Sequence, residues 1–389
     1  MLTYHTAGES HGKGILAFVD GFPAGLDVNL ETINGELRRR QGGYGRGARQ
    51  AIEADTVEIL TGVQGVRTLG SPIALWVKNK DYRLPDLGDL ESPRPGHGDL
   101  SGSRKYLTSM RTILERASAR ETAGRVAAGA LARQLLAPLG IQVFGFVREL
   151  GPVALPLSAS AEKLWANQNL QKLLQQRDEN ALYALCDTET EAQAKAAIDQ
   201  AREEGDTLGG VIEVRAVGLP FGLGTHAQWD AKLDGRLAQA AMAVQAIKGV
   251  EIGLGFESAR RPGSLVHDPI AYAADEAKTR TLGFARATNN AGGLEAGMTN
   301  AQPLILRAAM KPIATLRKPL PSVNLQTHEP TAASWERSDV CAVSAASVVL
   351  ENVIAFELAS AVVEKFGADS VAEIQARWEL FQTLAGNLS

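Results

Sequence analysis

Cysteine is scarce in this chain, which has two among 389 residues. Cys186 and Cys341 lie far apart and neither belongs to a CxxC pair, so the sequence excludes a disulfide framework and a zinc knuckle. No other metal-ligand spacing occurs, and we predict no metal site. We expect both cysteines to be buried, unreactive thiols.

Charge of one sign and long apolar runs are also lacking. The net charge is -4, which argues against general binding to nucleic acid or to anionic membranes. The longest apolar stretch, 343–363, is interrupted by Glu351, Asn352 and Glu357, and this pattern favours a buried helix over a membrane span. The N-terminus lacks the features of a signal peptide, so we expect a cytoplasmic protein.

Several nucleotide-binding motifs are missing. No GxGxxG follows a strand and opens a helix, and no GxxxxGK[ST] occurs, which excludes a Rossmann dinucleotide domain and a P-loop. GESHG at 8–12 fits the GxSxG elbow of serine hydrolases. That elbow needs a helix after the serine, whereas Lys13 to Asp20 alternates like a strand. A hydrolase therefore remains a minor alternative.

Two segment pairs repeat within the chain. Residues 8–26 match 205–223 at an offset of 197, and 62–75 match 293–306 at an offset of 231. After each member of the second pair we predict a polar loop and then an Ala-rich helix, over 108–137 and 344–365. We interpret the chain as one domain, 1–389, built by internal duplication. Its halves would cover about 1–150 and 205–370, separated by a helical insert at about 156–204.

Histidine and arginine supply the candidate chemistry. His11 and His97 are flanked by glycines, where backbone can approach a ligand closely. Arginines crowd residues 38–49 among glycines, and a second group follows His97: Arg38, Arg39, Arg40, Arg46 and Arg49, then Arg94, Arg104, Arg111, Arg116 and Arg120. Such a loop suits bidentate binding of phosphate and carboxylate. A solvated basic loop or a non-catalytic, RNA-binding arginine module is the alternative.

Longer motifs carry a family resemblance. They are TAGESHG at 6–12, ELRRRQGGYGRGAR at 36–49, RPGHGDL at 94–100, RASARETAGRVAAGA at 116–130, KGVEIGLGF at 248–256, NNAGGLEAGMTN at 289–300, KPIATL at 311–316 and RSDVCAV at 337–343. Together they closely resemble the chorismate synthase family over nearly the whole chain. Two positions depart from the pattern: Ala296 stands where many members have glycine, and Ser338 where many have histidine.

The resemblance implies an α+β fold, a β-α-β sandwich with central helices between antiparallel sheets and an internal pseudo-two-fold duplication, assembled as a homotetramer. It implies the 1,4-anti elimination of phosphate from 5-enolpyruvylshikimate 3-phosphate to give chorismate. The reaction requires reduced FMN without net redox change. We expect NADPH to act only indirectly, through a separate flavin reductase.

The resemblance also implies roles for individual residues. His11 would be the general acid to the departing phosphate, His97 would stabilise or protonate the reduced flavin, and Asp339 would join a proton relay through flavin N5. Ser10 and Ser118 would be their hydrogen-bond partners. FMN contacts would fall on Arg116, Ala117, Ser118, Gln245, Ala246, Ala296, Lys311, Pro312, Ile313, Ala314, Thr315 and Arg337. Substrate or NADP phosphate would meet Arg40, Arg46, Arg49 and Ser10.

Overall fold

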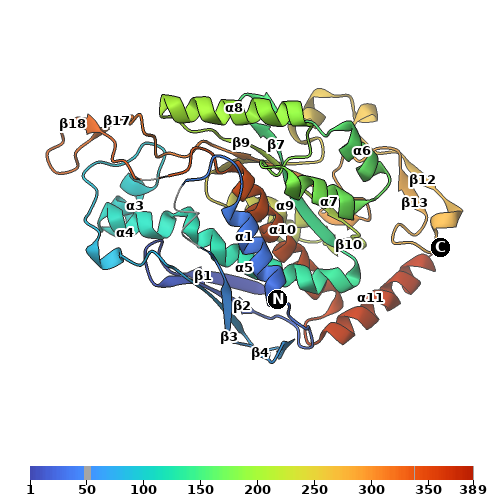
Figure 1. The fold of residues 1–389 in the computed structure, drawn as a ribbon. Helices are drawn as coiled ribbons and strands as arrows, with labels where there is room; N and C mark the ends of the chain where they lie inside the picture. Colours follow the sequence, from blue (N-terminus) through green and yellow to red (C-terminus); the bar gives the residue numbers. More distant parts are fainter. Residues whose placement is uncertain (48–53, 337, 389) are drawn as a thin grey trace.

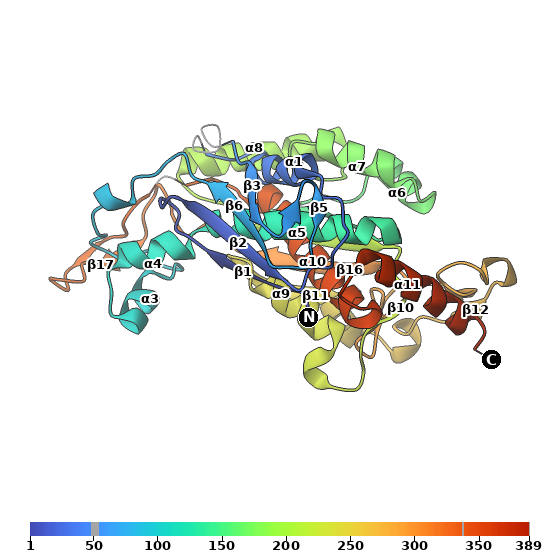
Figure 2. The same ribbon diagram turned by 90° about the horizontal axis from the view of Figure 1, so that it is seen from below.

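A computed structural model describes residues 1–47, 54–336 and 338–388. Two antiparallel sheets enclose a pair of helices, α5 (Thr122–Leu136) and α10 (Val343–Phe366), which cross the centre of the molecule (Figures 1 and 2). Helix α5 packs on the first sheet, α10 packs on the second, and the two helices pack on each other. The predicted α+β class is confirmed.

The first sheet has the order β1 (Thr3–Ala7), β2 (Gly14–Asp20), β6 (Ile73–Lys78), β3 (Val57–Thr61). Its inner face is formed by alternate residues that are fully buried against α5, namely Ile15, Ala17, Val19, Ile73, Leu75 and Val77. This period of two is what an antiparallel sheet with one covered face requires. The predicted strand after Lys13 is therefore confirmed.

The second sheet has the order β11 (Ile247–Ile252), β16 (Leu304–Met310), β9 (Gly210–Val217), β7 (Gln142–Leu150), β8 (Val153–Ala154). Its central pairing repeats that of the first sheet. Val19 pairs with Ile73 in the first sheet, and Ala216 pairs with Leu304 in the second. These partners are related by the same offsets of 197 and 231 that relate the repeated sequence segments.

A hydroxyl at corresponding positions repeats as well. Thr68 accepts a hydrogen bond from the backbone N–H of Leu26 at 2.9 Å and donates to the Pro23 carbonyl at 2.7 Å. Thr299 accepts from the N–H of Leu223 at 2.9 Å and donates to the carbonyl of Pro220 at 2.6 Å. Both threonines lie in the second strand of a small hairpin: Thr68 ends β5 (Arg67–Thr68), which pairs with β4 (Val63–Gln64), and Thr299 is the middle residue of β15 (Met298–Asn300), which pairs with β14 (Leu294–Glu295).

The remaining elements are eight α-helices and four small sheets of the described residues. The helices are α1 (Leu30–Gln41), α3 (Asp99–Tyr106), α4 (Met110–Ala117), α6 (Ala159–Ala166), α7 (Leu170–Glu179), α8 (Thr188–Glu204), α9 (Leu233–Met242) and α11 (Val371–Gly386). The small sheets contain β4 (Val63–Gln64) with β5 (Arg67–Thr68), β10 (Phe221–Gly224) with β15 (Met298–Asn300) and β14 (Leu294–Glu295), β12 (Ile270–Tyr272) with β13 (Phe284–Arg286), and β17 (Pro321–Val323) with β18 (Pro330–Ala332).

The prediction of one unbroken helix over 108–137 is wrong. Helix α4 ends at Ala117, and Ser118 adopts an extended conformation with φ -60° and ψ 144°. The Ser118 hydroxyl accepts from the N–H of Arg120 and so caps a short 3-10 turn that leads into α5. Serine competes well for backbone hydrogen bonds at helix starts. The break places the end of α4 and the start of α5 within a few residues of each other.

Helix α10 confirms the helix predicted over 344–365. By length and composition it could cross a membrane, yet 94% of its most apolar 18 residues are buried inside the protein. Glu351 and Asn352 are both fully buried within it. The helix is thus the central core element that its interrupted apolar run predicted.

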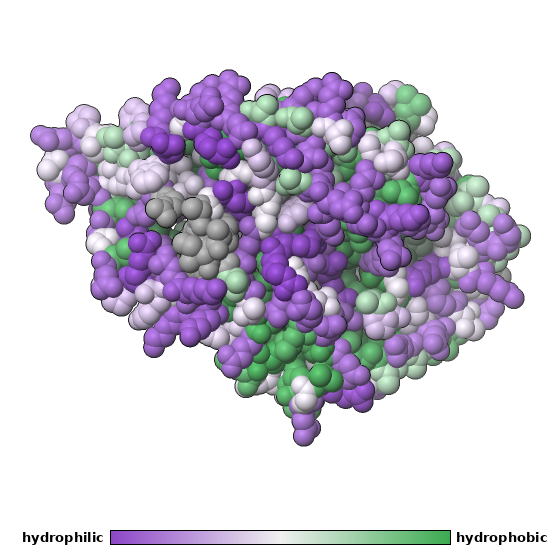
Figure 3. Space-filling model, viewed as in Figure 1, coloured by the Kyte–Doolittle hydropathy of each residue, from purple (hydrophilic) through white to green (hydrophobic). Residues whose placement is uncertain are grey.

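The outer faces of the two sheets differ. Helices α6 and α7 of the insert cover the second sheet, where Phe144 and Phe146 pack with Leu173. The outer face of the first sheet is left open, and Phe18 on β2 is 39% exposed. Figure 3 shows apolar side chains gathered at the lower edge of the molecule, over this sheet and its β4–β5 hairpin.

Candidate active site

The predicted site residues gather at one end of the layers. There the chain leaves β1, enters β2, leaves β6 and leaves β16, and both central helices begin. Helices α3 and α4 and the β17–β18 hairpin lie together at this end, on the left in Figure 1. Segments from both halves of the chain therefore meet around one region.

His11 lies in the loop between β1 and β2 and is held by a buried carboxylate. Its Nδ1 is 2.9 Å from Oε1 of Glu115 on α4, and its backbone N–H donates to Oε2 of Glu115 at 2.7 Å. Burial raises the pKa of Glu115, but the hydrogen bonds from His11 outweigh burial and leave that pKa below its ordinary value. Glu115 is therefore ionised at neutral pH.

The rest of this loop is fixed by Asn79 and Ser118. The side-chain amide of Asn79 donates to three backbone carbonyls of the loop, including that of Ser10 at 3.1 Å. The hydroxyl of Ser118 donates to that of Ser10 at 3.1 Å. A strand follows Ser10 where a hydrolase elbow would have a helix. The geometry supports an anchored ligand loop and not a nucleophile elbow.

Arg40 lies in an internal charge network and not on an open loop. Asp55 accepts from Arg40 at 2.7 Å and from Arg120 at 2.7 Å, and both guanidinium groups are buried. Burial raises the pKa of Asp55, yet the two arginines outweigh burial and lower it. Arg120 also donates to Asn79 at 2.7 Å. The arginine segment is thus connected to the His11 loop through Asp55, Arg120 and Asn79.

His97 occupies a second, similar arrangement. Its Nδ1 is 2.6 Å from Oδ1 of Asp99, and the other oxygen of Asp99, Oδ2, accepts from Arg94 at 2.8 Å. Arg94 in turn donates to the hydroxyl of Thr315 at 2.9 Å. Burial raises the pKa of Asp99, but hydrogen bonds from His97 and Arg94 outweigh it and lower that pKa. Lys311 donates to the carbonyl of Gly96.

Asp339 meets the arginine segment directly. Its carboxylate is 2.6 Å from Nη1 of Arg46 and accepts from the backbone N–H of Gly47 at 2.6 Å. The neighbouring Ser338 donates to the carbonyl of Thr315 at 3.1 Å. Thr315 therefore connects the two arrangements, because it accepts hydrogen bonds both from Arg94 beside His97 and from Ser338 beside the Arg46–Asp339 ion pair.

The helical insert reaches this site, although the sequence assigned it no chemistry. The hydroxyl of Tyr44 donates to Asp199 on α8 at 2.8 Å. Gly45 has φ +88°, and a Cβ there would lie 3.1 Å from the side chains of Cys341 and Ile198. Only glycine fits this left-handed, closely packed position easily. The insert thereby fixes the loop that carries Arg46.

Most of the predicted flavin contacts also lie here. Arg116 donates to the carbonyls of Thr6 and Gly8, next to Ala117 and Ser118 at the end of α4. Gln245 donates to Glu121 at 2.9 Å. The carbonyl of Ala246 accepts from the N–H of Lys311 at 3.0 Å, and that of Ile313, between Pro312 and Ala314, accepts from Thr207.

Ala296 is placed elsewhere in this chain. It forms the β14–β15 turn with φ +51°, and this hairpin joins the Leu304 end of β16, where Gly293 packs against Pro303. Lys311 follows the other end of that seven-residue strand, which at about 3.3 Å per residue is roughly 20 Å away. Arg49 and Arg337 lie outside the described residues.

Unpaired polar atoms concentrate at the site. Eight buried side-chain nitrogen and oxygen atoms of the described residues have no hydrogen-bond partner. Four of them surround this region: Nε of Arg40, Nε of Arg46, Oε1 of Gln245 and Nη1 of Arg111, the last of which lies 3.7 Å from the Glu115 carboxylate. Three are cationic N–H donors and one is an amide acceptor. That set fits a ligand with phosphate or carboxylate groups and ring N–H groups such as a flavin carries.

The structure also supplies residues that the sequence did not single out. Asp99 stands inside the quoted RPGHGDL motif, and Glu115 directly precedes Arg116. Asp99 is only two residues from His97, so its place in the motif was a signal that could have identified it. Glu115 is 104 residues from His11, and no periodicity or spacing marks it as a partner of that histidine. Among the described residues, no group of three or more His, Cys, Asp or Glu side chains could hold a metal ion.

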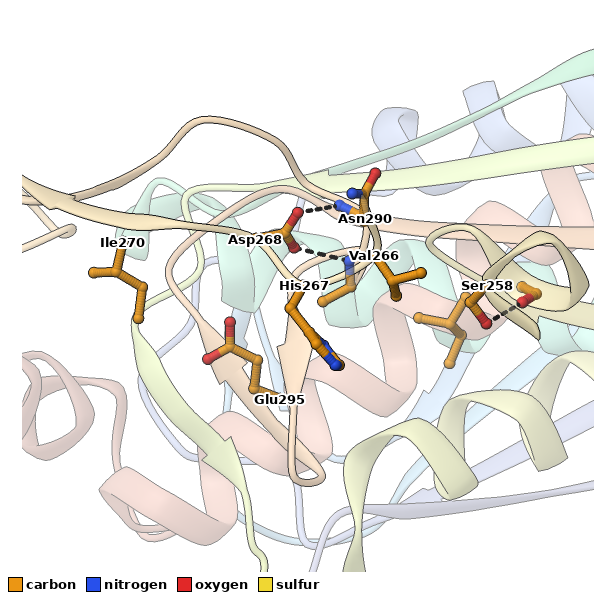
Figure 4. A pocket seen from close by; sticks show the side chains of 10 residues that line it. Ser258, Val266, His267, Asp268, Ile270, Asn290 and Glu295 are labelled. Carbon is orange, nitrogen blue, oxygen red and sulfur yellow. Dashed lines mark hydrogen bonds between the residues drawn. The ribbon is translucent and has the colours of Figure 1, made fainter. Parts of the chain in front are cut away.

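A cavity of about 440 Å³ lies away from this region, around His267, Asp268 and Ser258 (Figure 4). Asp268 accepts from the backbone N–H groups of Asn290 and Ala291, at 2.8 and 2.9 Å. The Ser258 hydroxyl donates to the carbonyl of Gly255. These polar groups are used in hydrogen bonds within the protein's own loops, so we do not regard this cavity as the candidate active site.

A second cavity, of about 420 Å³, borders the His11 loop at Gly8, Gly12 and Trp76.

Comparison with known proteins agrees with the geometry. The family model for chorismate synthase matches residues 2–363. The chorismate synthase of Geobacter metallireducens is 52% identical over 97% of this chain and 98% of its own, and that of Pelobacter propionicus is 53% identical with the same coverage. A solved crystal structure of chorismate synthase covers 100% of this chain and 99% of its own, with 42% identity and a TM-score of 0.79. The chain therefore belongs to the chorismate synthase family.

Proposed function

We propose that the site around His11, His97, Arg46 and Asp339 binds 5-enolpyruvylshikimate 3-phosphate and eliminates its phosphate. The family catalyses this 1,4-anti elimination, which gives chorismate in the shikimate pathway and depends on reduced flavin. The observation that carries the assignment is a pair of buried N–H donors that lack a hydrogen-bond partner, Nε of Arg40 and Nε of Arg46. The substrate carries one phosphate and two carboxylates, which require N–H donors of this kind.

In this proposal His11 is the general acid. Its Nδ1 faces Glu115, so Nε2 is the ring nitrogen left to donate a proton to the departing phosphate. Arg40, Arg46 and the undescribed Arg49 neutralise the phosphate charge, with Ser10 as a further donor. Protonation and charge neutralisation both turn phosphate into a better leaving group.

Reduced FMN, when bound, supplies transient electron density to the substrate. The residues that would hold it are Arg116 to Ser118, Gln245 and Ala246, Lys311 to Thr315, and the undescribed Arg337. His97, held by Asp99, would donate a hydrogen bond to the anionic flavin ring. Asp339 would relay the proton that leaves the substrate ring, with Ser118 and Ser10 completing the hydrogen-bond path.

An anaerobic assay tests these roles. With reduced FMN and substrate, chorismate absorbance and phosphate release should appear together. His11→Ala and His97→Ala should each lower kcat by roughly 10² to 10⁴, while FMN binding and the fold persist. The exposed His226 gives a matched control, since His226→Ala should leave the rate unchanged. Rates within a few-fold of wild type for both site variants would show that these histidines only stabilise their loops.

We also propose that the chain is an internal duplication and assembles as a homotetramer in the cytoplasm. The repeated strand order, register and threonine hydrogen bonds support the duplication. The uncovered apolar face of the first sheet supports assembly. In such an assembly a second copy could supply Ala296, which this chain places far from its own Lys311. Light scattering should give four times the monomer mass.

We propose finally that a separate enzyme reduces the flavin. The sequence has no dinucleotide-binding fingerprint, and arginines such as Arg40 and Arg46 bind a phosphate whichever molecule carries it, so they do not indicate a site for NADPH. Incubation of the pure protein with oxidised FMN, substrate and NADPH, without oxygen or dithionite, should give no chorismate. Steady product formation would show a reductase within the chain.

A further inference from the structure

We propose that Glu115 is a positioning residue for His11: it fixes the imidazole in the Nδ1–H tautomer, so that Nε2 is the atom that exchanges a proton. This inference rests on the proposed role of His11. Glu115 is 1% exposed at its side chain, and His11 is 8% exposed. Both carboxylate oxygens face Nδ1, at 2.9 and 3.1 Å.

The chemistry of a carboxylate dictates the tautomer. An ionised carboxylate only accepts hydrogen bonds, so the nitrogen facing it must carry the hydrogen. The ring nitrogen left over is Nε2, whose charged neighbours are more distant: Asp81 Oδ2 at 3.8 Å and Arg83 Nη2 at 3.5 Å. In the neutral ring Nε2 is therefore the nitrogen that can take up a proton, and in the imidazolium form it carries the proton that His11 can give to a ligand, while the Nδ1 hydrogen stays with Glu115.

Glu115 is itself held in place. Its oxygen lies 3.7 Å from Arg111, one turn earlier on α4. Arg111 donates to the carbonyl of Gly88 at 2.9 Å and to Glu336 at 2.7 Å. The carboxylate of Glu115 is thus held in one orientation. Such an orientation is needed to direct the His11 ring, whereas a carboxylate that acted only through its charge would not require it.

The two functions of Glu115 can be separated by substitution. Its Oε2 accepts the backbone N–H of His11, which shapes the loop, whereas the contact with Nδ1 orients the ring. In Glu115→Gln the amide oxygen can keep the backbone bond. The amide NH₂ would then donate to Nδ1, which forces the hydrogen to Nε2. This variant preserves the shape and inverts the tautomer.

Nitrogen-15 NMR of histidine-labelled protein, without substrate or flavin, tests the proposal. The wild type should show His11 with a protonated Nδ1, and Glu115→Gln should show a protonated Nε2. Turnover of Glu115→Gln should fall by roughly 10² to 10⁴ in kcat with KM changed less than threefold, as when a histidine is held in the wrong tautomer. Glu115→Asp should recover part of the rate, and the exposed Glu203→Gln should match wild type.

The outcomes separate this inference from the proposed function. A wild-type His11 that carries its hydrogen on Nε2 overturns the inference even if Glu115→Gln does not fold. So does a Glu115→Gln variant that keeps wild-type kcat. If the wild type shows the Nδ1–H tautomer but forms no chorismate, the proposed function fails while the positioning by Glu115 stands.

Discussion

The guanidinium of Arg46 lies 2.6 Å from the carboxylate of Asp339, so two residues expected to serve different parts of the reaction form an ion pair. The backbone N–H of Gly47 donates to the same carboxylate at 2.6 Å. The side chains of Arg46 and Asp339 are only 10% and 15% exposed. A phosphate that approaches Arg46 therefore meets a cation already shared with a carboxylate.

Asp339→Asn should separate proton relay from phosphate binding. The amide oxygen can still accept from Gly47, but the residue can no longer take a proton, so we expect kcat to fall by roughly 10² to 10⁴. KM for the substrate should stay level or fall, because Arg46 loses a competing anion. Anaerobic steady-state kinetics give both values, with the exposed Asp275→Asn as control. A raised KM with unchanged kcat would instead assign Asp339 to binding.

Tyr44→Phe should weaken substrate binding from a distance. The substitution removes the hydroxyl that donates to Asp199 at 2.8 Å and so frees the Arg46 loop from helix α8. One such bond is worth about 1 kcal/mol, which corresponds to roughly a fivefold rise in KM with kcat little changed. Tyr106 is 65% exposed, and Tyr106→Phe provides the control. An unchanged KM would show that the loop does not need the insert.

Glu351 should dominate the stability of the core. Its carboxylate is fully buried on α10 and pairs with Arg133 at 2.7 Å, Arg177 at 3.1 Å and Arg39 at 3.2 Å. Glu351→Gln removes the buried charge that the buried Arg177 and the partly buried Arg39 and Arg133 share, and we expect a loss of about 3 to 5 kcal/mol in the free energy of unfolding. Urea unfolding at pH 7 measures it. Glu364→Gln on the exposed side of the same helix should cost at most about 1 kcal/mol.

The same residue predicts an acid dependence. Burial raises the pKa of Glu351, but the three arginines outweigh burial and lower it from 4.5 to about 2. Because the folded pKa is depressed, the stabilisation is complete above pH 4.5 and is lost as the pH falls toward 2. The difference in unfolding free energy between wild type and Glu351→Gln should shrink by about 3 kcal/mol over that window. A constant difference would contradict the assignment.

Local patterns predicted much of this fold. The alternation after Lys13 predicted β2, and the interrupted apolar run predicted α10, because each depends on residues close in sequence. The break at Ser118 was missed, since one serine can cap a helix or lie within it. The partner of His11 was missed for another reason: Glu115 meets His11 across more than a hundred residues, and no spacing encodes that contact. The sequence predicted that the arginine segment binds anions, but only the structure shows that Arg40 forms an internal hydrogen bond with Asp55.

The two threonines at corresponding hairpin positions allow a thermodynamic test of the proposed duplication. Thr68→Val and Thr299→Val keep the side-chain shape but leave the buried N–H of Leu26 or Leu223 without its acceptor, at a cost of about 1 to 3 kcal/mol each. Since both hydroxyls make the same pair of bonds, the two losses in urea unfolding should agree within about 1 kcal/mol. Thr331→Val, at an exposed position on β18, should cost almost nothing. If one hairpin variant is as stable as wild type while the other is not, the matching geometry does not reflect matching energetics, and the repeat would be a likeness of backbone alone.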